Sequence, residues 1–311
     1  MENPADAAMG EKRGAMTKAN NTSHRAAMQL SCFSCQNRDK DEWCALSIDD
    51  MALLDKAKTT LEFQPGDLIY TQGDPCRGIY DIEGGTVAIR RTDSDGNSIL
   101  VRLAHAGQTL GYRDFFGGKE YTSSAEALRP VRVCHIESTA IGELLHHNPS
   151  LGLRFLERIA LDLESAEESL LQRSTLPIRT RLAHLLLTLK FRYSEVAGDG
   201  TIVIKLPMQR QDMAALLGTR PETLARAFQA MRQDGVLESS GRNVIIPDLD
   251  GLLDEIEAIP SLLHVFDWYS SPLHRVSPSP ARKLQPDAVL NSRIGGPGRH
   301  QHGPPAIRPQ P

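Results

Sequence analysis

Residues 209–235 read QRQDMAALLGTRPETLARAFQAMRQDG and predict two short helices that meet across a tight turn. Gly218 suits the left-handed residue that follows a helix, and Pro221 suits the first position of the next one, where its missing N–H costs nothing. Ala214 is small where two helices must approach closely, and Leu224 offers an apolar contact between them. This arrangement is typical of a helix-turn-helix, whose second helix enters the major groove of DNA.

The second helix of this motif would present polar side chains to a duplex. Glu222 and Arg226 lie one turn apart and share an exposed face with Thr223. Arginine can donate two hydrogen bonds to guanine and glutamate can accept one from cytosine, so we expect these residues to read bases. The alternative is a surface Glu–Arg pair that stabilises the helix by only a few tenths of a kcal/mol. We expect Arg220 and Arg232 to contact phosphates.

The segments around the motif predict a winged domain over residues 175–250. A helix with leucines on one side follows Pro177, and residues 201–206 (TIVIKL) predict a strand that ends before the motif. After the motif, residues 236–237 and 244–246 predict two strands joined by the polar turn at residues 239–242. We expect a short C-terminal helix over residues 251–269.

Upstream, residues 61–136 carry short apolar runs separated by turns such as residues 65–67 (PGD) and 95–97 (DGN). Turns spaced by about 8 to 12 residues favour an antiparallel sandwich or barrel. We therefore expect a pocket-forming β-roll, with the cysteine-containing segment before it, over residues 31–148. Together with the helices that follow, this predicts an α+β protein.

A long helix is predicted over residues 149–174. Its apolar residues recur at offsets of 3, 4, 3 and 4, which is a heptad seam. The seam consists of Leu156, Ile159, Leu163, Ala166 and Leu170. Because the seam is narrow, it favours pairing with the same helix of a second subunit, whereas a helix lying on its own roll is the alternative.

Length and composition restrict the classes of protein that this chain can be. A chain of 311 residues is long enough for two domains, and its net charge of −4 means that any nucleic-acid site is local. No apolar run approaches the roughly 20 residues that cross a bilayer, so we expect no membrane partner. The polar start lacks a secretory signal, which favours the cytoplasm, where five cysteines do not form a disulfide framework.

Both ends of the chain have the composition of mobile segments. Residues 1–30 show little periodic hydrophobicity, so we expect a disordered lead. Residues 270–311 hold nine prolines, six Lys or Arg and one acidic residue, which predicts a disordered basic tail.

The order of these parts resembles the CRP/FNR family of bacterial transcription regulators over residues 61–248. The resemblance rests on PGDLIYTQGDP (65–75), GIYDIEGGTVAI (78–89), the heptad helix and RQDMAALLGTRPETLARAFQ (210–229). It implies a roll of cyclic-nucleotide-binding type, a dimer helix, and a winged helix by which a homodimer reads a palindromic operator, with RNA polymerase as a further partner. It also implies that Glu222 and Arg226 read a GA-containing half-site. Ala225 stands where the FNR branch commonly has Ser, and Pro221 replaces a small apolar residue.

Four cysteines form a candidate metal site. Cys32, Cys35 and Cys44 form C-x2-C-x8-C, and Cys134 lies in the strand where the resemblance to FNR-type sensors implies a fourth ligand. Four thiolates suit either an iron–sulfur cluster or structural zinc, and the resemblance favours a 4Fe–4S cluster. Cys76 is the alternative to Cys44, because the gap before Cys44 is longer than in the best-known FNR proteins. A buried small hydrophobe is the simpler interpretation of Cys76 and an alternative for Cys134.

The resemblance also implies how such a site would act: an intact cluster favours the dimer, and oxygen degrades the cluster and weakens DNA binding. Cyclic AMP is not expected, because residues 121–124 (YTSS) lack the arginine that would hold its phosphate. A small effector in the roll remains an alternative signal.

Two enzyme classes are less favoured. The roll contains only His105 and His135, without the His-x-His pair of a cupin-like metal enzyme. A thiol oxidoreductase would place its C-x2-C motif in a βαβ unit, which the pattern does not predict.

Overall fold

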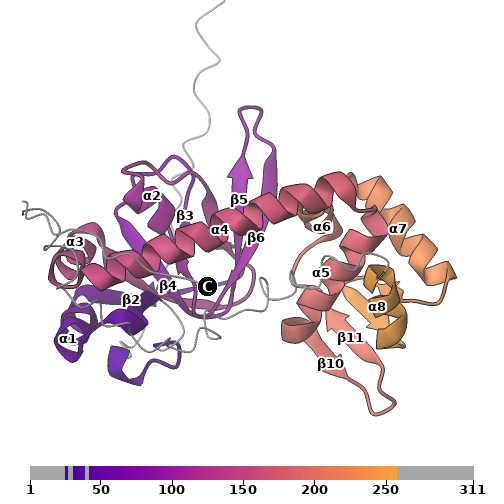
Figure 1. Cartoon of the computed structure of the whole chain (residues 1–311), viewed down its shortest axis with the longest axis horizontal. Coiled ribbons are helices and arrows are strands. Elements are labelled where there is room, and N and C mark those ends of the chain that lie inside the picture. The colour runs from indigo at the N-terminus through magenta and orange to yellow at the C-terminus, as the bar shows by residue number, and fades with distance from the viewer. Residues whose placement is uncertain (1–24, 27–30, 39–41, 258–311) are drawn as a thin grey trace, which may run out of the picture. The chain divides into compact units, whose positions relative to one another are not determined.

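The computed structural model describes residues 25–26, 31–38 and 42–257 (Figure 1). The predicted tail lies outside these residues, as do most of the predicted lead and the predicted C-terminal helix beyond residue 257. Within the predicted lead, Arg25–Ala26 form strand β1, which pairs with residues of β2 (Lys58–Phe63), so these two residues belong to a sheet. None of the helices in the described ranges is both long and apolar enough to cross a membrane.

The β-roll consists of two antiparallel sheets that face each other across an apolar core. The first sheet has the order β1-β2-β9-β4-β7, with β9 at Val131–Glu137, β4 at Gly78–Gly84 and β7 at Thr109–Leu110. The second has the order β3-β8-β5-β6, with β3 at Leu68–Tyr70, β8 at Ser124–Ala127, β5 at Thr86–Thr92 and β6 at Ser98–His105. This is the roll that the turn spacing predicted.

Glycine permits one sharp turn between the two sheets. Gly85 separates β4 from β5 and has φ +104, a region that L side chains rarely adopt. A Cβ at this position would lie 2.5 Å from the carbonyl oxygen of Pro130. The chain can therefore pass from one sheet to the other here only with glycine.

Short helices at the start of the described chain cover the first sheet. They are η1 (Cys32–Ser34), η2 (Glu42–Ala45) and α1 (Ile48–Ala57). A capping box between Ser47 and Asp50 starts α1, because each side chain accepts the other residue's backbone N–H. These three helices were not predicted from the sequence. Two further helices belong to the roll: α2 (Tyr112–Phe116) lies between β7 and β8, and α3 (Ser138–His147) follows β9.

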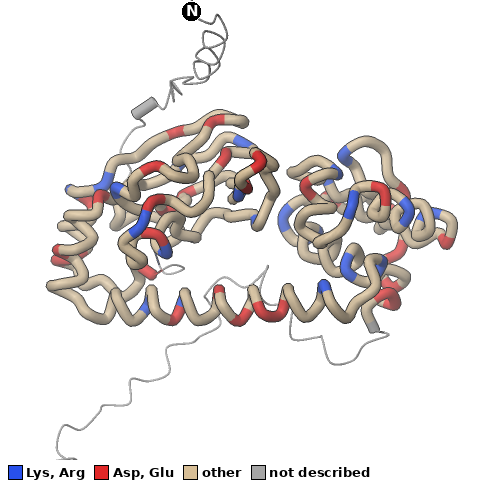
Figure 2. Tube along the Cα trace, turned by 90° about the horizontal axis from the view of Figure 1, so that it is seen from above, with Lys and Arg blue, Asp and Glu red and all other residues tan. Residues whose placement is uncertain are grey.

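The long helix α4 spans Pro149–Thr175, close to the predicted bounds (Figure 1). It packs one face on the roll through Leu151 and Phe155, which are 0% and 1% exposed. Most of the heptad seam lies elsewhere on the helix: Leu156, Leu163 and Leu170 are about 60% exposed or more. Acidic residues gather along the middle of α4 (Figure 2).

The seam prediction holds only in part for Ile159. This residue is half-buried and packs against the cluster that contains Leu151 and Phe155. Ala166 is exposed like the three leucines of the seam. The helix therefore packs on its own roll through a face beside the seam. Four of the five seam residues stay exposed within the described part of the subunit.

The winged domain begins with α5 (Ile178–Tyr193) and contains a sheet of order β10-β11-β13-β12. The strands are β10 (Ser194–Val196), β11 (Ile202–Lys205), β12 (Glu238–Ser240) and β13 (Asn243–Ile246). The predicted wing is present, but its first strand starts at Glu238, and residues 239–240 belong to the strand instead of the turn. Strand β10 was not predicted from the sequence.

The last described helix, α8 (Leu249–Glu257), belongs to the winged domain. Leu252 and Ile256 are 0% and 2% exposed and join the core of that domain. Arg179 on α5 forms an ion pair with Glu255 on α8. The predicted boundary at residue 250 is therefore too early, because apolar packing continues across it.

Candidate functional site

The helix-turn-helix consists of α6 (Arg210–Leu216) and α7 (Pro221–Gln233). One face of α7 is buried in the core of the winged domain and comprises Leu224, Ala227, Phe228 and Met231. On the opposite face, Glu222, Thr223 and Arg226 are all exposed. The structure thus leaves the three predicted base-reading side chains accessible on one helix.

The turn between the helices has the predicted local geometry. Gly218 has φ +61, and the N–H of Thr219 donates to the carbonyl of Ala214 at 2.9 Å. Arg220 is the extended residue that precedes α7, and Pro221 occupies its start. Arg220 and Arg232 are exposed at opposite ends of α7. Both predicted phosphate contacts are therefore accessible.

Gln229 on the same helix is a further candidate for base reading that was not predicted from the sequence. It is exposed and lies three residues after Arg226 and seven after Glu222, so the three share one face. Glutamine can bond adenine with two hydrogen bonds. The helical spacing alone could have identified this residue.

Two arginines fix the end of α6. Arg173 near the end of α4 donates from Nη2 to the carbonyl of Leu216 at 3.2 Å, and Arg181 on α5 donates to the carbonyl of Leu217. These carbonyls have no partner within α6, so the arginines satisfy the helix end. A Cβ at Gly218 would lie 2.9 Å from Cδ of Arg173. The turn therefore favours glycine for its backbone conformation, and a Cβ here would also require the side chain of Arg173 to move.

A second candidate site lies in the roll, where three of the five cysteines line one cavity. Cys32, Cys35 and Cys134 are the three, and the cavity has a volume of about 30 Å³. Cys44 is placed differently, because its sulfur accepts a hydrogen bond from Nη2 of Arg154 on α4 at 3.0 Å. Cys76 is also elsewhere: its thiol contacts the carbonyl of Gly78 at 3.5 Å. The structure thus brings together three of the four predicted ligands.

Local contacts hold the cysteines at this cavity. Ser31 caps η1, and Asp55 Oδ1 on α1 accepts the backbone N–H of Cys32 at 2.6 Å. Cys134 lies in the middle of β9, opposite Thr60 on β2 and Asp81 on β4. The N-terminal segment and the roll therefore contribute sulfur atoms from two directions.

Burial controls the protonation of these thiols. It raises the pKa of Cys32 to about 12 and also raises the pKa values of Cys35 and Cys134. The positive charge of Lys58 lowers the pKa of all three thiols, although burial outweighs it. The cysteines are therefore protonated at neutral pH unless a metal displaces their protons.

Buried carboxyl groups extend from the cavity toward α4. The thiol of Cys134 donates to Glu83 Oε1 at 3.1 Å. Asp81 also lines the cavity, and burial, with the charges of Glu42 and Glu83 beside it, raises the pKa of Asp81 to about 7. Thr109 donates to Glu42 at 3.0 Å and lies 3.5 Å from Asp81. The carboxyl groups thus connect β4 and β9 with η2.

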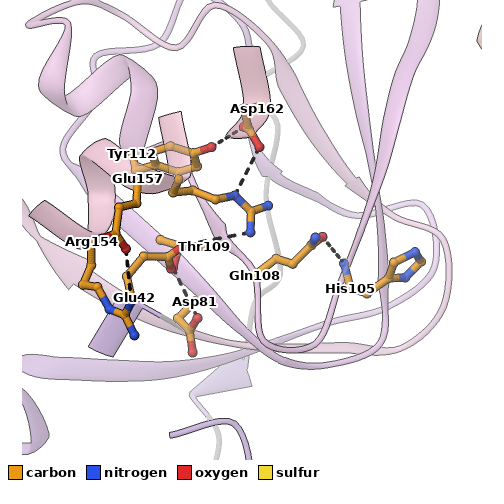
Figure 3. A network of polar contacts seen from close by, with 10 residues as sticks. Glu42, Asp81, His105, Gln108, Thr109, Tyr112, Arg154, Glu157 and Asp162 are labelled. Carbon is orange, nitrogen blue, oxygen red and sulfur yellow. Dashed lines mark hydrogen bonds and ion pairs between the residues drawn. The ribbon is translucent and has the colours of Figure 1, made fainter. Parts of the chain in front are cut away.

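Figure 3 shows how this network reaches the long helix. Nη1 of Arg158 on α4 lies 4.0 Å from Glu42, and Nε of Arg158 donates to Asp162 at 3.1 Å. The hydroxyl of Tyr112 donates to the same Asp162. A path of polar contacts therefore joins the wall of the cysteine cavity to α4.

The side chains that line the cavity are of the chemical type that binds a sulfur-ligated metal. Three thiols are soft ligands that zinc and iron–sulfur clusters accept. Across the described ranges, no three His, Cys, Asp or Glu side chains are already placed to hold an ion. The cavity is large enough for one small ion or one or two waters, and a larger group would need it to open. Residues 39–41, between Cys35 and Cys44, lie outside the described residues.

The segments that would hold a cyclic nucleotide contact each other and the aromatic interior of the roll. Asp114 accepts hydrogen bonds from the backbone N–H and the hydroxyl of Thr122 at 3.2 and 2.8 Å. The rings of Tyr70 and Tyr121 are stacked with centroids 4.1 Å apart, and both residues are buried. Side chains thus occupy this part of the roll.

Comparisons with known proteins identify similar domains in the same order. The family described as cyclic nucleotide-binding domain matches residues 60–148, and the Crp-like helix-turn-helix domain matches residues 180–255. These matches cover the roll and the winged domain respectively.

Curated proteins are similar over most of the chain. FnrL, a transcriptional activator protein of Cereibacter sphaeroides, is 25% identical over 72% of this chain and 91% of its own length. FnrA, a transcriptional activator protein of Stutzerimonas stutzeri, is 28% identical over 73% of this chain and 93% of its own length. The anaerobic regulatory protein of Haemophilus influenzae is 26% identical over 71% of this chain and 86% of its own length.

Solved structures share the fold. A transcriptional regulator of the CRP/FNR family from Thermus thermophilus is 26% identical, with a TM-score of 0.53 over 64% of this chain and 98% of that chain. FixK2 from Bradyrhizobium japonicum is 24% identical, with a TM-score of 0.54 over 64% of this chain and 97% of that chain. The predicted order of roll, long helix and helix-turn-helix is confirmed.

Proposed function

The chain is a DNA-binding transcriptional regulator of the CRP/FNR family and not an enzyme, and on this premise we propose that a 4Fe–4S cluster at the cysteine cavity controls its dimerisation and operator binding. The observation that carries the proposal is the meeting of Cys32, Cys35 and Cys134 at one cavity. Cys44 completes the proposed ligand set. Bound there, an iron–sulfur cluster supplies sensitivity to oxygen and other oxidants.

The chain's own residues provide the link from this site to the long helix. Trp43, beside Cys44, packs edge-on against Phe155 of α4, with ring centroids 5.7 Å apart. Glu42 approaches Arg158 of the same helix. Movement of the segment that contains Cys44 toward the metal site would therefore change the packing of α4, because both residues contact that helix.

The exposed seam of α4 is the proposed dimer interface. Leucine side chains in water favour burial at about 1.5–3 kcal/mol each, and Leu156, Leu163 and Leu170 repeat at heptad spacing. A second copy of α4 presents the same seam, so a two-fold symmetric pair buries both. Such a homodimer presents two copies of α7 to a palindromic operator, where it acts on transcription by RNA polymerase.

On each half-site, Glu222, Thr223 and Arg226 read bases, while Arg220 and Arg232 contact phosphates. Their exposure on and beside α7 supports these roles. The proposal does not include cyclic AMP, because aromatic side chains and the Asp114–Thr122 contacts occupy the corresponding part of the roll.

Metal analysis of protein purified without oxygen tests the proposed cofactor. We expect iron and sulfide in similar amounts, together with visible absorbance that air bleaches. The C134S variant should lose both. Colourless anaerobic protein that holds only zinc would overturn the cluster and leave the DNA-binding function intact.

Structural zinc is the second candidate, and one contact favours it. Glu83 lies 3.1 Å from the sulfur of Cys134, and zinc accepts carboxylate oxygen beside sulfur. The same metal analysis separates the two, because zinc brings neither sulfide nor visible colour.

A further inference from the structure

Lys58 is a buried cation at the cysteine cavity. It is the first residue of β2, its side chain is 2% exposed, and it lines the cavity with Cys32, Cys35 and Cys134. A buried ammonium group is costly unless negative charge compensates it. In this structure Asp55 supplies part of that charge, with its Oδ1 3.5 Å from Nζ of Lys58.

Asp55 connects this cation to the cysteine segment. The same Oδ1 accepts the backbone N–H of Cys32 at 2.6 Å, and Oδ2 accepts the hydroxyl of Ser31 at 3.3 Å. Lys58 is thereby held beside Cys32, while its strand pairs with β9 and brings it near Cys134. The ammonium lies between the two segments that supply the sulfur atoms.

The cavity that contains Lys58 also holds carboxyl groups, whose negative charge opposes the formation of thiolates. Asp81 and Glu83 line the cavity, and Glu83 is already bonded to Cys134. Cysteine binds metals as the thiolate, so ligation adds negative charge beside these carboxyl groups. Arg38 also lines the cavity but is only partly buried. Lys58 is therefore the buried cation placed to offset that charge.

We propose that Lys58 is a positioning residue of the sulfur-ligated site, whose ammonium compensates the thiolates of Cys32 and Cys134 and so sets the metal affinity. The inference rests on the proposed function, since it requires these cysteines to act as ligands. It concerns the affinity of the site for metal and assigns Lys58 no role as a ligand.

Titration of the full-length, reduced protein with Co²⁺ tests this role, because sulfur-bound cobalt gives a characteristic charge-transfer absorption. Loss of a residue that supports metal ligands commonly lowers affinity by about 10–100-fold, and we expect that loss in K58M. K58R keeps the charge and should bind within about threefold of the wild type. Equal affinities of K58M and the wild type would overturn the proposal, and so would failure of K58R to recover any affinity lost in K58M.

The D55N variant separates compensation from a purely structural ion pair. Asparagine still accepts the N–H of Cys32 but removes a negative charge, so we expect Co²⁺ affinity equal to or higher than that of the wild type. If Lys58 serves only to anchor the segment that contains Cys32, D55N and K58M should weaken Co²⁺ binding alike. That result would overturn the proposal. Thermal unfolding of the metal-free variants shows whether each one folds. If K58M does not fold, the Co²⁺ affinity of D55N decides between the two roles.

The cobalt experiment is independent of the proposed iron–sulfur cluster. Wild-type protein that contains no iron or sulfide yet shows the expected order of Co²⁺ affinities would contradict the proposed function and support the role of Lys58. Protein that contains the cluster but binds Co²⁺ equally well in all variants would support the proposed function and overturn the role of Lys58.

Discussion

Arg154 on the long helix donates a hydrogen bond to the sulfur of Cys44 at 3.0 Å, although the two residues are 110 positions apart in the sequence. The same guanidinium donates to Glu157, one turn further along α4, at 3.0 Å. A candidate ligand of the proposed cluster thus contacts the candidate dimer helix directly. Under the proposed function, Cys44 gives up its hydrogen bond with Arg154 when it binds the cluster.

Removal of the Arg154 contact should reduce the coupling between the cysteine site and dimerisation. In R154L, the ratio of dimer dissociation constants with and without the cluster should fall about fivefold, which corresponds to about 1 kcal/mol. Sedimentation equilibrium of anaerobic and air-treated protein measures this ratio. E157Q, which removes only the other partner of Arg154, is the control, and an unchanged ratio in R154L would contradict the coupling.

Base reading by α7 predicts a selective loss of DNA affinity in R226A. The variant should bind a duplex selected by the wild type about 1–3 kcal/mol more weakly, while binding to random DNA changes little. Competition binding at fixed salt concentration distinguishes the two. R91A, which removes an exposed arginine from β5 of the roll, is the control. Equal losses on both duplexes would assign Arg226 to phosphate contact instead.

The seam of α4 predicts that a charge at its centre separates the subunits. Leu163 is 60% exposed, so L163E should leave the subunit folded but raise the dimer dissociation constant at least about tenfold. Leu161, which is 41% exposed and points about 200° away around the helix, provides the matched L161E control. Dimers of unchanged affinity in L163E would exclude the seam as the interface.

The tight turn of the helix-turn-helix predicts a local stability effect. G218A places a Cβ on a residue with φ +61 and within 2.9 Å of Arg173, so unfolding should require about 1–2 kcal/mol less free energy. Gly198 has no neighbouring atom within 4 Å of its Cβ position, and G198A is the control. Urea unfolding measures both, and equal midpoints would show that the turn tolerates a side chain.

His105 predicts a pH dependence of stability. Burial, with the positive charges of Arg192, Arg102 and Arg129, lowers its pKa to about 3 in the folded protein, against 6.5 when unfolded. The unfolded chain therefore binds the proton first, so the contribution to stability is complete above pH 6.5 and is lost as the pH falls toward 3.

Between pH 7 and pH 5, the wild type should lose up to about 2 kcal/mol more than H105Q. Chemical unfolding at both pH values provides the measurement. H146Q, at an exposed histidine of α3, is the control. Parallel losses in the wild type and H105Q would show that His105 is not the group responsible.

The helix-turn-helix could be predicted because its signals are local. Gly218 and Pro221 mark a helix end and a helix start by their backbone preferences alone, and the apolar period of α7 separates its buried and exposed faces. The seam of α4 is also a local repeat. Its partial burial at Ile159 could not be predicted, because it depends on how α4 lies on the roll.

The cysteine site could be predicted only by residue type. Spacing along the chain grouped Cys44 with Cys32 and Cys35, whereas in the structure Cys44 contacts Arg154. The roles of Asp55 and Lys58 also depend on contacts between segments, since no sequence pattern connects them with Cys134. The short helices before the roll are similarly stabilised by packing more than by their own periodicity.

Sedimentation velocity of one anaerobic sample, before and after exposure to air, tests most directly whether sulfur-bound iron controls pairing of the subunits. The visible absorbance should be recorded in the same run. We predict a coloured dimer that becomes a colourless monomer and releases its selected duplex. A sample that loses its iron while it remains a dimer with unchanged DNA affinity would contradict this account.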